Sequence, residues 1–152
     1  MLPNGGFIYF YQTVKELSVV DIAPSVHLIK FVAQFSGGGS GLLEQVSFWK
    51  FNSKSDFFEQ IGLITLTEQG EYKLRKNGML ITADAYMQPG ETHFAPHRFY
   101  IEAYRYVANE GYRKVLGYLT TMKYPSFDEV DHINVIFHET PKIEKLLKEL
   151  TP

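Results

Sequence analysis

The alternation of apolar and polar positions along the chain predicts a fold built mainly from β-strands. The segment 70–87 is the clearest case, because strand-like runs flank Asn77 and Gly78 on both sides. Asn-Gly supplies the positive φ angles of a type I′ turn, whose twist matches a two-stranded hairpin. Further turns that contain glycine are predicted at 67–72 and 108–112. Three turn signals in series predict a meander of antiparallel strands.

Segment 98–107 can be assigned in two ways, and the choice decides the fold. As a strand, it places Phe99 and Ile101 on one face and a row of tyrosines on the other. As a helix, it would cover 96–109 and begin at Pro96, a residue that suits a first helical turn. The density of tyrosine and phenylalanine favours the strand.

Other runs rich in β-branched and aromatic residues also predict strands. They cover residues 7–14, 26–35, 45–51 and 132–138. A short helix is predicted at 55–62, because Ser55 can cap its first turn and Gly62 can end it.

A second helix is predicted at the C-terminus, over residues 140–150. Thr140 can cap it, and Pro141 suits its first turn. Four apolar residues follow at the spacing of one helical face. They are Ile143, Leu146, Leu147 and Leu150. Such a stripe is expected to close one face or end of the sheet.

The predicted fold is therefore a β-rich α+β fold: an antiparallel meander sheet or partial barrel closed by a C-terminal helix. The alternative is a ferredoxin-like α+β fold, with a helix at 96–109 between strands at 79–87 and 113–123. A length of 152 residues predicts a single domain over residues 1–152. The content of 12 Phe and 10 Tyr adds weight to the sheet.

Net charge and cysteine content exclude several classes of partner and of functional site. A net charge of -2 argues against a nucleic-acid partner, which needs a concentrated basic surface. The absence of cysteine excludes disulfides, thiol nucleophiles and zinc sites with cysteine ligands. No apolar run approaches the roughly 18 residues of a membrane span, and the first residues lack a signal-peptide pattern. A cytoplasmic protein without a membrane partner is expected.

The stretch MQPGETHFAPHR, residues 87–98, holds three potential metal ligands close together: Glu91, His93 and His97. On a helix, His93 and His97 would share a face and could hold a metal ion, with Glu91 or Glu102 as a third ligand. Pro96 lies between the two histidines, and proline costs about 3 kcal/mol inside a helix. A loop or strand-end site with His93, His97 and Glu102 is the form of the metal hypothesis that remains.

The overlapping stretch ADAYMQPGETHF resembles the Pro-Gly-x-x-His segment of cupin barrels, with Gly90, Glu91 and His93 at the matching positions. In that family the segment follows a strand and contributes one residue to the barrel mouth. Metal-binding cupins also carry an upstream His-x-His with a following Glu, whereas here the only upstream histidine is His27. The resemblance implies a cupin-like barrel that acts as a small metal-dependent enzyme or as a ligand sensor.

Tyrosines after this stretch form a second candidate site, because tyrosine suits both ligand cavities and protein interfaces. The predicted binding residues are Tyr100, Tyr104, Tyr106, Tyr112 and Tyr118, with Tyr124 nearby in sequence. No complete catalytic set is found, so the leading hypothesis is a non-enzymatic module that binds a protein or small molecule without a cofactor. Sheet edges and aromatic faces also invite homo-oligomerisation.

Overall fold

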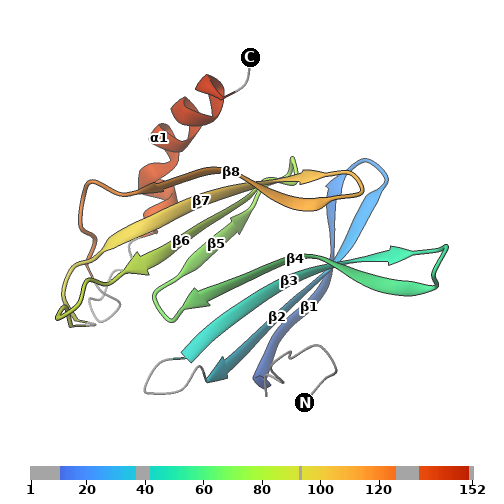
Figure 1. Ribbon diagram of the computed structural model, residues 1–152, viewed down its shortest axis with the longest axis horizontal. Helices are drawn as coiled ribbons and strands as arrows, with labels where there is room; N and C mark the ends of the chain where they lie inside the picture. Colours follow the sequence, from blue (N-terminus) through green and yellow to red (C-terminus); the bar gives the residue numbers. More distant parts are fainter. Residues whose placement is uncertain (1–10, 37–41, 93, 126–133, 151–152) are drawn as a thin grey trace. The chain divides into compact units, whose positions relative to one another are not determined.

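The computed structural model describes residues 11–36, 42–92, 94–125 and 134–150. These residues form two antiparallel sheets of four strands each and one C-terminal helix (Figure 1). Within each sheet, every strand pairs with its neighbours in sequence, which is the order of a meander. The elements are β1 (Tyr11–Ala23), β2 (Val26–Ser36), β3 (Leu42–Asn52), β4 (Phe57–Thr67), β5 (Glu71–Leu74), β6 (Leu80–Tyr86), β7 (Arg98–Val107), β8 (Gly111–Leu119) and α1 (Val135–Glu149). The predicted β-rich α+β fold with a C-terminal helix is confirmed.

The chain divides into two compact units. Unit 1 comprises Met1–Val20 and His27–Glu68, and carries the first sheet, β1–β4. Unit 2 comprises Asp21–Val26 and Gln69–Pro152, and carries the second sheet, β5–β8, together with α1 and the turn between β1 and β2. The single domain expected from the chain length stays a prediction.

In unit 1, four deeply buried apolar side chains share one face of the first sheet. The register sets Val32 opposite Val46, and side chains two residues apart along a strand point the same way. Phe48 and Leu66 therefore share this face. All four are at most 3 % exposed. Burial of such side chains is the main favourable term in folding.

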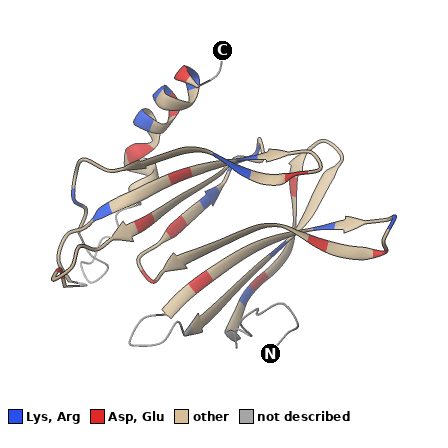
Figure 2. Ribbon diagram, viewed as in Figure 1, with Lys and Arg blue, Asp and Glu red and all other residues tan. Residues whose placement is uncertain are grey.

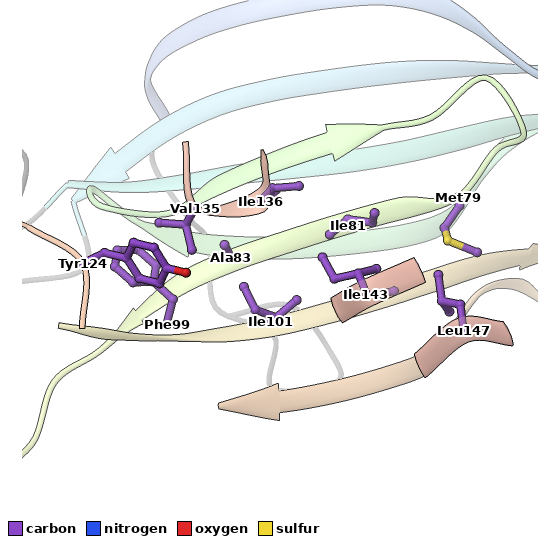
Figure 3. Packing of buried hydrophobic residues seen from close by; sticks show 11 residues of the cluster. Met79, Ile81, Ala83, Phe99, Ile101, Tyr124, Val135, Ile136, Ile143 and Leu147 are labelled. Carbon is purple, nitrogen blue, oxygen red and sulfur yellow. The ribbon is translucent and has the colours of Figure 1, made fainter. Parts of the chain in front are cut away.

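In unit 2, α1 covers one face of the second sheet, and the two surfaces enclose a hydrophobic core (Figure 3). Ile101 and Ile81 lie at the centre of the sheet side and are fully buried. Ile143 and Leu147 face them from the helix. The remaining members of the core are Met79, Ala83, Phe99, Ala103, Tyr124, Val135 and Ile136.

The assignment of segment 98–107 as a strand is confirmed, and the ferredoxin-like alternative with a helix at 96–109 is wrong. β7 alternates in burial, with Phe99, Ile101 and Ala103 buried toward α1. It pairs with β6 on one side and β8 on the other. These two partners satisfy the backbone hydrogen bonds of the segment, and the alternation in burial matches its alternation of apolar and polar side chains.

The predicted hairpin over 70–87 is confirmed, but its turn is not of type I′. A type I′ turn needs positive φ at both central residues, and here only Gly78 has one, at 76°. The N–H of Gly78 donates to the Arg75 carbonyl at 2.9 Å, and the N–H of Arg75 donates to the Met79 carbonyl at 2.8 Å. The loop is therefore a turn with glycine in the left-handed region at its end, a second common way to close a hairpin.

The short helix predicted at 55–62 is wrong, because β4 runs through this segment from Phe57. Residues 53–56 form the turn instead, and Asp56 takes a positive φ of 58°. Phe58 then pairs with Phe51 across the β3–β4 hairpin. The local capping pattern was outweighed by pairing with β3 and by the β-branched and aromatic residues that follow.

The C-terminal helix is confirmed, but it begins earlier than predicted. Asn134 caps it by accepting a hydrogen bond from the Phe137 N–H at 2.8 Å, and Pro141 lies inside the helix. The strand predicted at 132–138 is therefore wrong from Val135 onward, and residues 132 and 133 lie outside the described residues. Because the helix starts earlier, Ile136 joins its buried face, while the predicted stripe residue Leu150 is exposed.

The strands predicted at 26–35 and 45–51 are confirmed as β2 and β3, each somewhat longer than predicted. The strand predicted at 7–14 is confirmed for residues 11–14, and residues 7–10 lie outside the described residues. Lys and Arg are interspersed with Asp and Glu along the strands and α1 (Figure 2). In the described part of the chain, no helix has both the length and the apolar character needed to cross a membrane.

Candidate binding surface

Four tyrosines of the β7–β8 hairpin lie on the face of the second sheet opposite α1, and we call them the tyrosine surface. They are Tyr100, Tyr104, Tyr106 and Tyr112. The register explains their shared face, because Tyr106 lies opposite Tyr112, and Tyr104 and Tyr100 precede Tyr106 by two and six residues, both even numbers. The hairpin also extends beyond β6, whose pairing with β7 ends at Tyr104.

A carboxylate at the centre of the tyrosine surface organises its polar groups. The Glu102 carboxylate accepts hydrogen bonds from the Tyr104 hydroxyl and, at 2.9 Å, from Lys114 Nζ. Burial, followed by the bond to Glu102, holds the pKa of Tyr104 well above its ordinary value. The hydrogen bond to Glu102 raises the pKa of Lys114. Tyr104 therefore stays a neutral hydroxyl, and the one negative charge beside it is matched by a positive charge.

The remaining tyrosines combine packing with exposure. The rings of Tyr106 and Tyr112 meet edge to face with centroids 6.0 Å apart, and burial raises the pKa of Tyr112. Tyr100 is 42 % exposed. A Cβ added at Gly117 would lie 3.8 Å from the Tyr100 hydroxyl oxygen, so this side chain reaches over a position without a side chain. The surface is thus aromatic and uncharged overall, and partly open to solvent.

Tyr118, predicted as a fifth member, lies on the opposite face of the sheet. Ala103 pairs with Leu116 but Tyr104 pairs with Lys114, so Val115 is an extra residue in β8. One extra residue reverses which positions point to which face, and it turns Tyr118 toward α1.

On the α1 face, a buried carboxylate binds two tyrosines. Glu139 accepts hydrogen bonds from the Tyr118 hydroxyl at 2.8 Å and from the Tyr124 hydroxyl at 2.6 Å. Burial and then the bond to Glu139 raise the pKa of both tyrosines. Lys142 Nζ lies 4.1 Å from the centroid of the Tyr118 ring, a cation–π contact. Every member of this network has a partner within unit 2, which indicates a role in stabilising the docked helix.

Of the three residues in the metal hypothesis, the structure describes His97 and Glu102, and it does not bring these two side chains together. His97 points to the α1 side of the second sheet and is fully buried, whereas Glu102 lies on the opposite face. His93 lies outside the described residues. Within those residues, no three His, Asp or Glu side chains form a group that could hold a metal ion.

His97 instead helps to join two segments outside the named strands: the segment that precedes β7 and the segment that follows β8. Its backbone pairs with Tyr124 in both directions, at 2.9 and 2.7 Å. Its Nδ1 lies 3.4 Å from Glu91 Oε2, and Lys123 Nζ lies 2.7 Å from the other oxygen of Glu91. The N–H of Gln88, and next the Lys123 ammonium, lower the pKa of Glu91 to about 2. In the segment that resembles cupins, Glu91 therefore stays ionised and forms a charged cluster with Lys123 and His97.

The sheet order also differs from what the cupin resemblance implies. Cupins are jelly rolls, in which the strands follow Greek-key paths between two sheets. Here each sheet is completed by consecutive strands before the next begins. The short resemblance around Gly90 is thus not accompanied by the cupin strand order.

A second aromatic surface was missed by the sequence reasoning. Phe51, Phe58 and Leu63 share one face of the β3–β4 hairpin, while Phe57 lies at its tip. These four form the phenylalanine surface, and each is between 48 and 71 % exposed. The assignment of residues 55–62 to a helix concealed it. Two adjacent phenylalanines after a polar turn, followed by β-branched residues, were the available signal.

The fold and surfaces define a β-rich α+β protein with exposed aromatic hairpins. Among solved structures, the chain is similar to the crystal structure of a protein called CarG, with a TM-score of 0.53 and 15 % sequence identity. The match covers 80 % of this chain and 96 % of that chain, and it supports the fold alone. No protein-family model matches the sequence, and no curated protein matches it.

Proposed function

We propose that this protein is a non-enzymatic binding module that uses the tyrosine surface to hold a protein partner. The observation that carries the proposal is the gathering of four tyrosines on one sheet face around the Glu102–Lys114 pair. Tyrosine is enriched at interfaces because its ring contributes contact area and its hydroxyl contributes a hydrogen bond. Partly exposed rings such as Tyr100 can gain further burial on binding.

The charge of the surface indicates the chemistry of the partner. Glu102 is already matched by Lys114 and by the Tyr104 hydroxyl. A strongly charged partner would have to compete with this pair, whereas an uncharged amphipathic segment would not. We therefore expect a partner segment with apolar groups for the rings and carbonyl or amide groups for the hydroxyls.

The test compares two variants of the same hairpin. Tyr100→Ala combined with Tyr106→Ala removes two rings from the tyrosine surface, whereas Arg105→Ala removes an exposed side chain from the opposite face. Tagged wild-type and variant proteins are used to capture partners from an extract of the source cells, and the captured proteins are quantified by mass spectrometry. A partner held by the wild type and by Arg105→Ala, but lost with the tyrosine variant, is expected.

Calorimetry with the purified partner then measures the loss. We expect the tyrosine variant to weaken binding at least tenfold, equivalent to about 1.4 kcal/mol. Circular dichroism must show that both variants remain folded. Equal capture of every partner by the tyrosine variant and by the wild type would refute the proposal.

A further inference from the structure

The outer edges of the two sheets differ in their protection against pairing with another chain. Natural proteins protect exposed edges with short strands, charged side chains or proline. β5 has only four residues, β8 carries Arg113 and Lys114, and β1 carries Lys15 and Asp21. β4 lacks these features, because its 11 residues include one charged side chain, Glu59, and no proline.

The outer edge of β4 is also well suited to pairing. Within the described residues, β4 pairs with β3 on one side and with no strand on the other. Past the bulge at Ile61, residues 62–67 pair with β3 in regular register, carry no charge and are rich in β-branched side chains. Leu63 and Phe58 are 51 and 53 % exposed on one face of this strand. Segments of this composition favour association through their edges.

We propose that β4 pairs antiparallel with β4 of a second copy of this chain, so that the two first sheets join into one continuous sheet. Antiparallel pairing of a strand with itself is two-fold symmetric and closes after two copies. Pairing of β4 with a protected edge such as β1 would instead bring Lys15 and Asp21 into the junction. In the dimer, Leu63 and Phe58 of both copies lie on the same face, which reduces the exposed apolar area.

Light scattering coupled to size-exclusion chromatography tests the proposal on the full chain. The wild type is expected to have twice the chain mass of 17.5 kDa at micromolar and higher concentrations. Leu63→Lys places on β4 the charge that other edges carry, and should halve the measured mass. The matched control is Val19→Lys on β1, a residue that is 71 % exposed, and it should remain dimeric. Circular dichroism checks the fold of both variants.

The absence of cysteine allows a direct second measurement. Single cysteines introduced by Leu63→Cys or Thr65→Cys should become linked between copies on oxidation, whereas Val19→Cys should not. A monomeric wild type, open-ended polymers, or a dimer that survives Leu63→Lys would each overturn the proposal. Partner capture tests the tyrosine surface, whereas molecular mass and crosslinking test the β4 dimer. Failure of one proposal therefore leaves the other standing.

Discussion

Hairpins β3–β4 and β7–β8 occupy the same place in two meanders, yet their aromatic residues differ in chemistry. Each is formed by the last two strands of a four-stranded sheet, and each contains one extra residue in its second strand, Ile61 or Val115. The β7–β8 hairpin presents tyrosines whose polar neighbours include Glu102. The β3–β4 hairpin presents phenylalanines, which have no polar atom to offer solvent.

The difference shows how one backbone plan supports two kinds of surface. Tyrosine can remain half-exposed in a monomer, because its hydroxyl keeps a hydrogen bond while its ring packs. Exposed phenylalanine gains more from being covered, which is why the phenylalanine surface leads us to a second copy and the tyrosine surface to a separate partner.

The strongest contrast is expected between a side chain buried beneath α1 and an exposed side chain on β4. Ile101→Ala removes a fully buried side chain beneath α1 and should lower the free energy of unfolding by about 2–5 kcal/mol. Leu63→Ala on β4 should change it by no more than about 0.5 kcal/mol in dilute protein. Urea unfolding followed by circular dichroism measures both. A large loss for Leu63→Ala in dilute protein would show that this side chain is already covered within one chain.

A smaller contrast is expected between the two carboxylates that bind tyrosines. Glu139→Ala leaves the Tyr118 and Tyr124 hydroxyls without their acceptor and should cost about 1–3 kcal/mol. Tyr104→Phe removes one bond on the half-exposed tyrosine surface and should cost less than about 1 kcal/mol. Both values come from the same urea experiment. Equal losses would mean that the tyrosine surface is as important for stability as the network beneath α1.

Acid should weaken the contacts that ionised Glu91 makes in the charged cluster of unit 2. The folded-state pKa of Glu91, about 2, lies below the ordinary value of 4.5. The stability contributed by ionised Glu91 is therefore complete above pH 4.5 and is lost as the pH falls toward 2. Unfolding midpoints of the wild type and Glu91→Gln should differ at pH 6 and converge near pH 2. A constant difference across this range would contradict the prediction.

The smallest effect is expected at the gap beneath Tyr100. Gly117→Ala adds a Cβ at ordinary contact distances, 3.8 Å from the Tyr100 hydroxyl oxygen and 3.9 Å from the Lys114 side chain. Because glycine weakens a strand interior, the variant should gain up to about 0.5 kcal/mol of stability. Thermal unfolding measures the gain. A loss above that size would reveal that Tyr100 and Lys114 cannot adjust to the added group.

Local sequence patterns predicted the strand at 98–107 because both of its faces follow a simple alternation. They failed at 55–62, where Ser55 and Gly62 imitate helix ends. The pairing of Phe58 with Phe51 joins two different segments of the chain, and a pattern within one segment does not show such a pairing. Most of the tyrosine surface was predicted from tyrosine spacing alone. Tyr118 was assigned to the wrong face because one extra residue in β8, Val115, reverses the face to which the following side chains point. Nothing in the local sequence around Val115 predicts this bulge.

The close approach of Gly78 to Ile22 has a consequence for how unit 2 folds. A Cβ at Gly78 would lie 2.7 Å from the Ile22 carbonyl oxygen, so the turn between β5 and β6 touches a segment that is distant in sequence. Pairings within the meander join strands that are neighbours in sequence and can form rapidly, whereas this contact requires a long loop to close first. We expect it to form late, and Gly78→Ala to accelerate unfolding more than it slows refolding.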